Sequence, residues 1–207
     1  MSKYYDHDKI WERRNDHNHP VWGSYSVVLY KRILSLFEEH GIRGGGLADF
    51  GCGAGKFGEL AQQAGFKYFG IDDSAAAINL GQKSWPEMSL QVFDLAHSDL
   101  PEDQQNLAES GSAINSLHCL TESEHRRQFL RNMSLALKPG ANLFVSTMVG
   151  PVSDGYRASE NPRLYLDPDE VVAELAEHGF TTLLYRTDLP ASNINGVPNL
   201  EVIVRKA

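Results

Sequence analysis

Residues 47–55 read Leu-Ala-Asp-Phe-Gly-Cys-Gly-Ala-Gly, a short apolar strand that breaks into alternating glycines. Apolar residues then recur at helical spacing over residues 57–64, so a helix is expected to begin at Lys56. A strand, a glycine turn and a helix bring backbone N–H groups and a helix N-terminus close to a ligand. Glycine suits such a turn because it tolerates positive φ and has no side chain to hold a ligand away.

Two classes of ligand fit this turn, and a neighbouring carboxylate separates them. Residues 53–58, Gly-Ala-Gly-Lys-Phe-Gly, match the Gly-x-Gly-x-x-Gly letters of a dinucleotide site. Asp49 lies two residues before the first glycine, where its charge would repel a pyrophosphate and attract an ammonium or sulfonium group. The turn therefore favours a positively charged nucleoside, and a glycine turn that binds no ligand is the remaining alternative.

An acidic pair follows the second expected strand. This strand covers residues 66–71 and ends on Asp72-Asp73-Ser74, about 20 residues past the glycines. A carboxylate at this spacing suits a hydrogen bond to ribose hydroxyls. We assign that contact to Asp72, with Asp73 as its neighbour, and expect Ser74 or Asp73 to cap a helix over residues 75–83.

The strands that follow continue the alternation. A third strand at residues 89–93 ends on Asp94-Leu95, where Asp94 either contacts a ligand or only caps the turn before His97. A fourth strand is expected at residues 112–117, followed by a helix to about residue 137. Lys-Pro-Gly at residues 138–140 is expected to stop that helix before a fifth strand at 142–148, because proline cannot continue it.

Taken together, the motifs of residues 47–148 resemble those of the class I S-adenosylmethionine-dependent methyltransferases. In that family the acid of the glycine motif lies near the methionine end of the cofactor. The acid after the second strand binds ribose, and the acid after the third accepts from the adenine amino group. The resemblance implies S-adenosylmethionine as the cofactor. It implies a binding site made of Asp49, Gly51, Cys52, Gly53, Gly55, Asp72, Asp73, Asp94, Leu95 and Ser116.

The resemblance also indicates where a methyl group would be transferred. The turn after the fourth strand borders the transferable methyl group in this family, so His118 is the candidate general base. Packing of His118 against the nucleoside, without a base role, is the alternative. Tyr25, Tyr156 and Tyr165 are expected to line the acceptor site. The transfer itself requires the acceptor atom, the carbon and the sulfur to be held in line.

The whole pattern predicts an α/β protein with a Rossmann-like, doubly wound, seven-stranded, mostly parallel sheet and helices on both faces. An amphipathic helix is expected at residues 24–40, and another near residues 167–179. The last strands are expected at residues 181–186 and 200–205. The resemblance implies that the final strand inserts antiparallel into the sheet. The long irregular segment at residues 150–165 is expected to act as a lid or a connector.

Two parts of one domain are expected. Residues 1–41 form an N-terminal helical leader or cap, and residues 42–207 form the cofactor-binding methyltransferase core. The leader is rich in aromatic residues and histidines, and it either folds across the cofactor or simply packs on the core. No metal site is predicted, because His7, His17 and His19 have neither helical i,i+4 spacing nor a carboxylate cluster beside them.

Composition narrows the range of partners. The 207 residues include 19 basic and 27 acidic side chains, a net charge of -8, so no basic stripe for nucleic acid is expected. Arg126, Arg127 and Arg131 are expected on the solvent face of their helix. Two cysteines suggest no disulfide framework, and no apolar run is long enough to span a membrane. A cytoplasmic monomer or homodimer is therefore expected.

Methyl transfer to a small-molecule acceptor is the function that the sequence favours. A methyltransferase acting on a protein or a nucleic acid is the first alternative, although the turn after the fourth strand lacks an Asn/Asp-Pro-Pro-Tyr signature. A NAD-dependent oxidoreductase is the second alternative, because Gly-rich turns and ribose-binding acids also occur in dinucleotide enzymes.

Overall fold

The computed structural model describes residues 8, 9, 11, 12, 24–150, 164–187 and 199–207. Its strands are β1 (Gly45–Phe50), β2 (Phe66–Asp72), β3 (Ser89–Val92), β4 (Ala108–Ile114), β5 (Leu137–Met148), β6 (Phe180–Arg186) and β7 (Asn199–Lys206). Its helices are α2 (Ser24–Glu39), α3 (Lys56–Gln63), α4 (Ala75–Ser84), α5 (Ser123–Ala136) and α6 (Pro168–Glu177), with short 3₁₀ turns at Glu102–Gln104 and Leu117–Cys119. Apart from β4 and β5, these elements agree with the sequence expectation to within two residues at either end.

The seven strands form one sheet in the order β3-β2-β1-β4-β5-β7-β6. β2 pairs in parallel with β1 and β3, and β4 pairs in parallel with β1 and β5. β7 is antiparallel to both β5 and β6, as the resemblance implied. The expected Rossmann-like α/β fold with seven strands is confirmed. Because the chain runs outward from β1 and from β4 in opposite directions, their carboxyl ends form the switch point at which ligands bind in such sheets.

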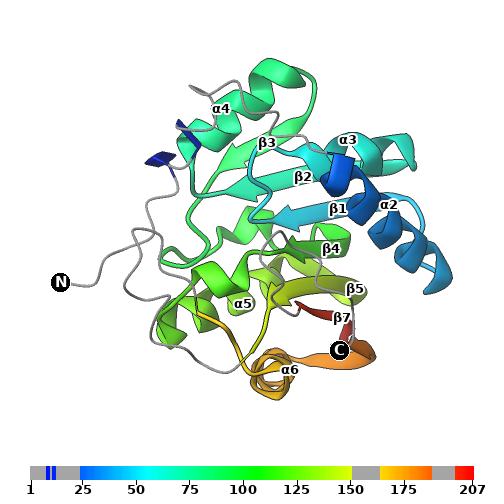
Figure 1. Cartoon of the computed structure of the whole chain (residues 1–207), viewed down its shortest axis with the longest axis vertical. Coiled ribbons are helices and arrows are strands. Elements are labelled where there is room, and N and C mark those ends of the chain that lie inside the picture. The colour runs from blue at the N-terminus through cyan, green and yellow to red at the C-terminus, as the bar shows by residue number, and fades with distance from the viewer. Residues whose placement is uncertain (1–7, 10, 13–23, 151–163, 188–198) are drawn as a thin grey trace.

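Apolar side chains pack on both faces of this sheet, and Figure 1 shows α2 and α3 on one side of it and α5 and α6 on the other. The α2 and α3 face is built on a cluster that includes Ile33, Phe37, Leu47, Phe57 and Phe144. The α5 and α6 face is built on a cluster that includes Leu130, Met133, Leu143, Val171 and Val202. Each fully buried side chain of this size stabilises the fold by roughly 1.5–3 kcal/mol, so the two clusters fix the carboxyl edge of the sheet from both sides.

The fourth and fifth strands depart from the sequence expectation. β4 ends at Ile114 rather than at residue 117. α5 ends at Ala136, one residue before its expected end, but the expectation that Lys-Pro-Gly separates this helix from the fifth strand was wrong, because these residues lie within β5. Leu137 pairs with Ala108 and Asn142 with Ser110, so residues 138–141 form a bulge that Gly140, at φ +78°, accommodates.

The expectation for Arg126 was also wrong, since this side chain is buried at 6% exposure. Its guanidinium donates two hydrogen bonds to the Glu174 carboxylate of α6, at 2.8 and 2.7 Å, and one to Leu120 O at 3.3 Å. A two-pronged pair of this kind fixes orientation as well as distance, so it joins α5 to α6. Arg127 and Arg131 are exposed, as expected.

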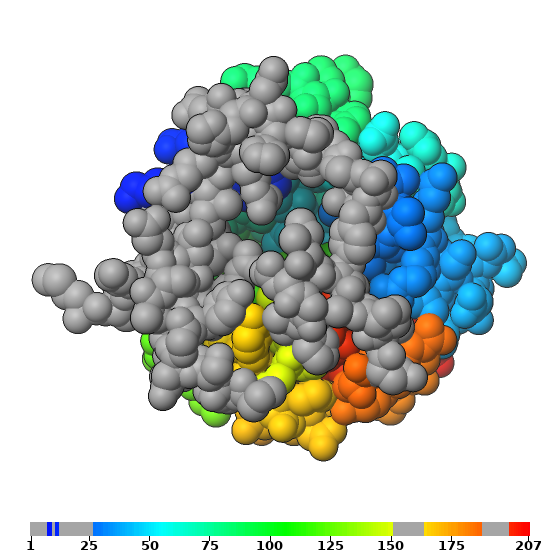
Figure 2. Space-filling view, viewed as in Figure 1, coloured from blue at the N-terminus to red at the C-terminus, as the bar shows by residue number. Residues whose placement is uncertain are grey.

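The helices of the described residues are either too short or too polar to cross a membrane. Figure 2 shows the outside of the molecule from the same direction, with α2 and α3 together at the right and α6 and β6 at the bottom. The residues that follow β1, β2, β3 and β4 belong to one edge of the sheet, because these four strands are parallel neighbours. That edge carries most of the predicted site.

Candidate functional site

The glycine turn after β1 is shaped by its backbone conformation. Gly51, Gly53 and Gly55 have φ of +74°, +56° and +76°, a backbone region that residues with a Cβ rarely adopt. Gly51 N–H and Cys52 N–H both donate to Ile71 O of β2, at 2.8 and 3.0 Å. The turn therefore lies at the carboxyl edge of the sheet, where the sequence placed it, and these two N–H groups donate within the protein.

Asp72 connects this turn to the end of β2. Its Oδ2 accepts from Gly53 N–H at 2.7 Å, and its Oδ1 accepts from Ser74 N–H at 3.0 Å. Ser74 in turn accepts from Ala77 N–H at 3.1 Å, so the prediction that Ser74 caps α4 is confirmed. Asp72 is buried at 9% exposure, whereas Asp73 is exposed. Of the two acids, Asp72 is the one fixed against the glycine turn.

Asp49 is engaged inside the sheet. Its Oδ1 accepts from Ser112 Oγ at 2.6 Å, and its Oδ2 accepts from the Tyr68 hydroxyl at 2.7 Å. Burial raises the pKa of this carboxyl from the usual 3.8 to about 6, although both hydrogen bonds act to lower it. Each oxygen of Asp49 keeps further acceptor capacity, but the side chain is only 2% exposed. The charge of the Asp49 carboxylate can still attract a positively charged ligand at the neighbouring glycine turn.

The end of β1 and the end of β4 meet through Ser116. Its Oγ donates to Phe50 O at 3.0 Å. A Cβ added to Gly51 would lie 2.3 Å from Ser116 Oγ, far closer than atoms pack, so only glycine fits position 51. Ser116 is thus at the switch point of the sheet, next to the predicted cofactor turn.

The loop after β3 is shaped by Asp94. Its Oδ1 accepts from Ala96 N–H and His97 N–H, each at 3.0 Å, and its Oδ2 lies 2.8 Å from His97 Nδ1. Asp94 therefore caps this turn, which was the alternative left open by the sequence. Leu95 is buried, and its carbonyl accepts from Asn132 Nδ2 at 2.8 Å. A contact from Asp94 or Leu95 to adenine stays a prediction.

Parts of the N-terminal leader lie directly on this site. A Cβ added to Gly53 would come within 2.6 Å of Trp11 Cζ2, so the indole packs against the glycine turn. Asp8 Oδ1 accepts from Ser74 Oγ at 2.6 Å and from Ala76 N–H at 3.0 Å, at the start of α4. The aromatic composition of the leader predicted contact with the core. It did not single out Trp11 or Asp8.

His118 is almost fully buried, at 2% exposure, in the turn after β4. Its Nδ1 accepts from Met148 N–H at 3.4 Å and lies 3.3 Å from Thr147 Oγ1. A backbone N–H can only donate, so a neutral His118 carries its proton on Nε2. In that form Nε2 is a hydrogen-bond donor. The base role of His118 stays a prediction, and the geometry favours the alternative in which it packs.

The structure gives less about the predicted acceptor residues. Tyr165 is buried beside the short bridge between Val149 and Leu166. Tyr156 lies outside the described residues, and so does the side chain of Tyr25. Cys52 is present as a free thiol, and burial together with nearby carboxylates raises its pKa well above the usual value. It is therefore a poor nucleophile.

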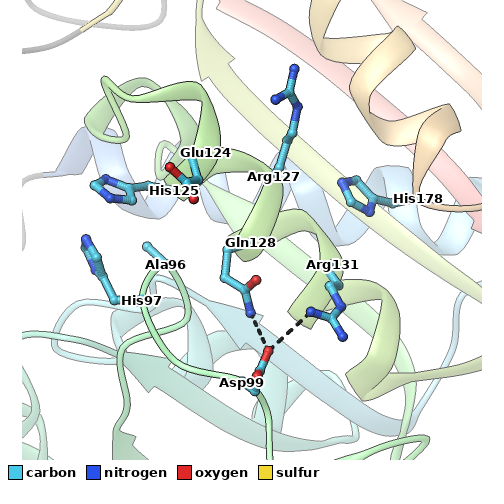
Figure 3. A pocket seen from close by; sticks show the side chains of 9 residues that line it. All are labelled: Ala96, His97, Asp99, Glu124, His125, Arg127, Gln128, Arg131 and His178. Atoms are coloured by element: carbon cyan, nitrogen blue, oxygen red, sulfur yellow. Dashed lines mark hydrogen bonds and ion pairs between the residues drawn. The ribbon is translucent and has the colours of Figure 1, made fainter.

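A hollow of about 500 Å³ lies beyond the Asp94 loop, between that loop, α5 and the end of α6 (Figure 3). His97 and His125 face each other there with ring centroids 4.1 Å apart. Asp99 accepts from both Gln128 and Arg131, at 3.0 and 3.3 Å. Within the described part of the chain, no group of three His, Cys, Asp or Glu side chains is arranged to hold a metal.

Sequence reasoning missed Asn115, the first residue after β4. Its N–H donates to Ser146 O of β5 at 2.8 Å, and its backbone has φ of +58°. Asparagine is one of the few side chains that tolerate this conformation. An asparagine directly after a buried strand and before Ser116 was the available signal, but it is weak without the strand ends.

Comparison with known proteins agrees with this geometry. Residues 24–189 match a family described as a methyltransferase domain, which is most of the chain. The chain belongs to this family. The prediction of a class I S-adenosylmethionine-dependent methyltransferase is confirmed at the level of the family, and S-adenosylmethionine is the cofactor of its members. In this methyltransferase domain the glycine turn follows β1 and Asp72 ends β2, and their contacts with the cofactor stay a prediction.

One curated relative matches this methyltransferase domain in sequence. It is the ubiquinone biosynthesis O-methyltransferase of Acinetobacter baylyi, 25% identical over 138 residues. The match covers 64% of the chain but only 52% of the relative. The matched part thus spans about half the length of that protein, and the activity of the whole relative is not carried over by the match alone.

Solved structures share the fold at low identity. A Burkholderia thailandensis 1,6-didemethyltoxoflavin-N1-methyltransferase, solved with 1,6-didemethyltoxoflavin and S-adenosylhomocysteine, superimposes with a TM-score of 0.71 at 17% identity. That match covers 97% of this chain and 87% of the other. A Mesorhizobium loti S-adenosylmethionine-dependent methyltransferase gives a TM-score of 0.63 at 18% identity, over 77% of this chain and 90% of the other. Both agree with the fold of the methyltransferase domain.

Proposed function

We propose that this chain transfers a methyl group from S-adenosylmethionine to a small-molecule acceptor. The observation that carries the proposal is the double contact of Asp72, which accepts from Gly53 N–H at 2.7 Å and from Ser74 N–H at 3.0 Å. These bonds hold a carboxylate suited to ribose hydroxyls against the glycine turn. In a chain of the methyltransferase-domain family, this arrangement of carboxylate and turn supports a binding site, called here the seat, for an amino-acid nucleoside.

The proposed seat runs across the carboxyl ends of four neighbouring strands. The loop after β3, with Asp94 and Leu95, would hold the adenine, and Asp72 after β2 would hold the ribose. The turn after β1 would hold the amino-acid end. The residues fit the cofactor, because three glycines with positive φ shape a turn at the carboxyl end of β1, beside the Asp72 carboxylate. Cys52, Asp73 and Ser116 remain proposed contacts of the same seat.

When bound, S-adenosylmethionine supplies a methyl group on a positively charged sulfur: an acceptor atom bonds to the methyl carbon in line with the breaking carbon–sulfur bond, and the sulfur leaves as a neutral thioether. The chain's own task is to orient the reactants and to exclude water. The packing of Trp11 on Gly53 and the bonds of Asp8 at α4 support a capping role for residues 1–41. Residues 42–207 would then form the core of the same domain.

The acceptor would lie beyond β4, at the end of the seat opposite the adenine. His118 follows β4, and Tyr165 is buried near the end of β5, so both belong to this end of the sheet edge. A small-molecule acceptor is supported by the relatives, one of which is named for ubiquinone biosynthesis and another of which binds 1,6-didemethyltoxoflavin. The net charge of -8 also disfavours a polyanionic acceptor.

Calorimetric titration tests the cofactor assignment. S-adenosylmethionine and S-adenosylhomocysteine should bind with dissociation constants of roughly micromolar size, and NAD should not bind. Asp72→Ala should abolish binding of both sulfur nucleosides, whereas Asp103→Ala, at an exposed position before β4 and at the opposite edge of the sheet, should retain it. Asp72→Asn keeps one acceptor oxygen and shows whether a loss reflects misfolding of the turn. Binding of NAD with no binding of the sulfur nucleosides would replace the proposal by the oxidoreductase alternative.

The acceptor class needs a second experiment. The enzyme is supplied with S-adenosylmethionine that carries a tritium-labelled methyl group, together with a cell extract split by size into small molecules and macromolecules. Label in the small-molecule fraction is the expected result. Label confined to protein or nucleic acid would favour the macromolecular alternative. The Asp72→Ala variant serves as the control, because it should transfer no label to either fraction.

A further inference from the structure

Asn115 lies where β4 ends, at the switch point of the sheet. Its N–H donates to Ser146 O of β5, and the next residue, Ser116, bonds to the last carbonyl of β1. Asn115 therefore stands between the glycine turn on one side and β5 on the other. A side chain in this place can reach a ligand that crosses from β1 to β4.

The backbone of Asn115 is strained. Among the described residues, only Asn115 and Asn106 have a positive φ without being glycine, at +58° and +54°. Asn106 is exposed and precedes β4, at the opposite end of that strand. Strained residues persist when something else in the molecule benefits from them, and they cluster at ligand sites. The two asparagines thus form a matched pair, one at the carboxyl edge and one far from it.

The side chain of Asn115 carries a second unfavourable feature. Its Oδ1 is shielded from solvent and has no hydrogen-bond partner among the residues that the structure describes. A buried carbonyl oxygen without a donor is costly, so native proteins rarely keep one without a reason. The neighbouring Ser146 Oγ on β5 is in the same condition within the described residues. Two buried polar atoms without a partner in the described part of the chain therefore lie on neighbouring residues at this point of the edge.

The direction in which the cofactor would lie across the strands indicates which of its groups could donate to Asn115 Oδ1. With the nucleoside over β3 and β2, the strand order β3-β2-β1-β4 brings the amino-acid end of the cofactor to β1 and β4. That end carries an ammonium group, which needs hydrogen-bond acceptors. Asp49, the acid of the glycine motif, is buried within the sheet and accepts from Ser112 and Tyr68, whereas Asn115 Oδ1 accepts no hydrogen bond among the described residues. We infer that Asn115 Oδ1 accepts a hydrogen bond from the α-ammonium group of S-adenosylmethionine. The inference rests on the proposed function.

Two ligands that differ only at this end test the inference. S-adenosylhomocysteine carries the ammonium group, whereas 5′-methylthioadenosine keeps the nucleoside and lacks the amino-acid part. Asn115→Ala should weaken calorimetric binding of S-adenosylhomocysteine about tenfold, the size expected for one hydrogen bond to a charged group. Binding of 5′-methylthioadenosine should be unchanged. Asn115→Asp keeps an acceptor and adds charge, so it should bind S-adenosylhomocysteine at least as tightly as the native chain.

Substitution by glycine separates the effect of backbone strain from the effect of the side chain. Asn115→Gly removes the strain together with the amide, so it should keep or raise the melting temperature while losing affinity about tenfold. Asn106→Gly relieves the same strain away from the site and should leave binding unchanged. Together the two variants show whether a loss of affinity comes from the amide itself.

The outcomes distinguish the inference from the function on which it rests. Failure of the native chain to bind S-adenosylhomocysteine would remove the proposed function. Normal binding by the native chain and by Asn115→Ala would overturn only the role of Asn115. Equal weakening of both ligands in Asn115→Ala would mean a structural role and would also overturn it, as would loss of binding in Asn115→Asp.

Discussion

Arg32 of α2 and Glu201 of β7 form an ion pair with two hydrogen bonds, one of them from Nη1 to Oε2 at 2.7 Å. The Glu201 side chain is buried at 1% exposure, and Arg32 at 34% covers it from the α2 side. The pair fixes α2, the last helix of the residues 1–41 leader, to β7, the strand next to the β6 edge of the sheet. It also neutralises a carboxylate beside Ser146, close to the carboxyl edge.

Replacing Arg32 by methionine should therefore destabilise the fold, because the Glu201 charge would remain buried and unpaired. We expect a loss of about 2–4 kcal/mol in the free energy of unfolding, somewhat below the full cost of breaking a buried pair since Arg32 is partly exposed. Urea denaturation gives this value. Arg43→Met is the matched control, because Arg43 pairs with Glu38 at 3.7 Å and both are exposed. Similar losses in the two variants would contradict the assignment.

The raised pKa of Asp49 predicts an unusual pH dependence. A carboxyl whose pKa is about 6 in the folded state and near 3.8 when unfolded binds its proton more tightly when folded. Its contribution to stability is therefore greatest below pH 4 and is lost as the pH rises toward 6, by about 3 kcal/mol. Asp49→Asn should remove this term. The difference in unfolding free energy between native and variant chains, measured from pH 4 to 7, should shift in favour of the variant as pH rises. A flat difference would refute the pKa.

The local signals in the sequence were enough for the architecture. The glycine turn, the acids after β2 and β3 and the cap at Ser74 depend on residues close together in the chain, and all were predicted at their observed places. The bulge in β5 was not, because its partner is distant. Lys206 Nζ, at the far end of the chain, donates to Ser134 O and Leu137 O at 2.6 Å and so closes α5 before Lys-Pro-Gly is reached.

The finer chemistry of the site depended on the same kind of distant contact. Nothing near Asp49 in the sequence indicates that Tyr68 and Ser112 would engage both of its oxygens, since these contacts arise only when β2 and β4 flank β1. The same holds for Asn115, because its place at the switch point follows only from the pairing of β4 with β1 and β5. Residue type predicted the ligand class, and pairing of strands decided which atoms are available to it.

Trp11 provides a test of the cap. Because its indole packs on Gly53, Trp11→Ala should expose the glycine turn and accelerate dissociation of S-adenosylhomocysteine several-fold. Stopped-flow displacement measures this rate. Trp85→Ala is the control, since Trp85 lies at the end of α4 and away from the turn. Unchanged dissociation in Trp11→Ala would show that the leader packs on the domain without covering the cofactor, the alternative that the sequence left open.

The contacts of His118 make a prediction that needs no knowledge of the acceptor. Since its Nδ1 accepts from Met148 N–H at 3.4 Å, the neutral ring should carry its proton on Nε2. Long-range ¹⁵N–¹H correlation spectra near neutral pH distinguish the two ring nitrogens, and the signal should be assigned by comparison with His118→Gln. A proton on Nδ1 would free Nε2 as a base and restore the general-base assignment. A proton on Nε2 leaves His118 able to donate a hydrogen bond and unable to remove a proton from the acceptor at that atom.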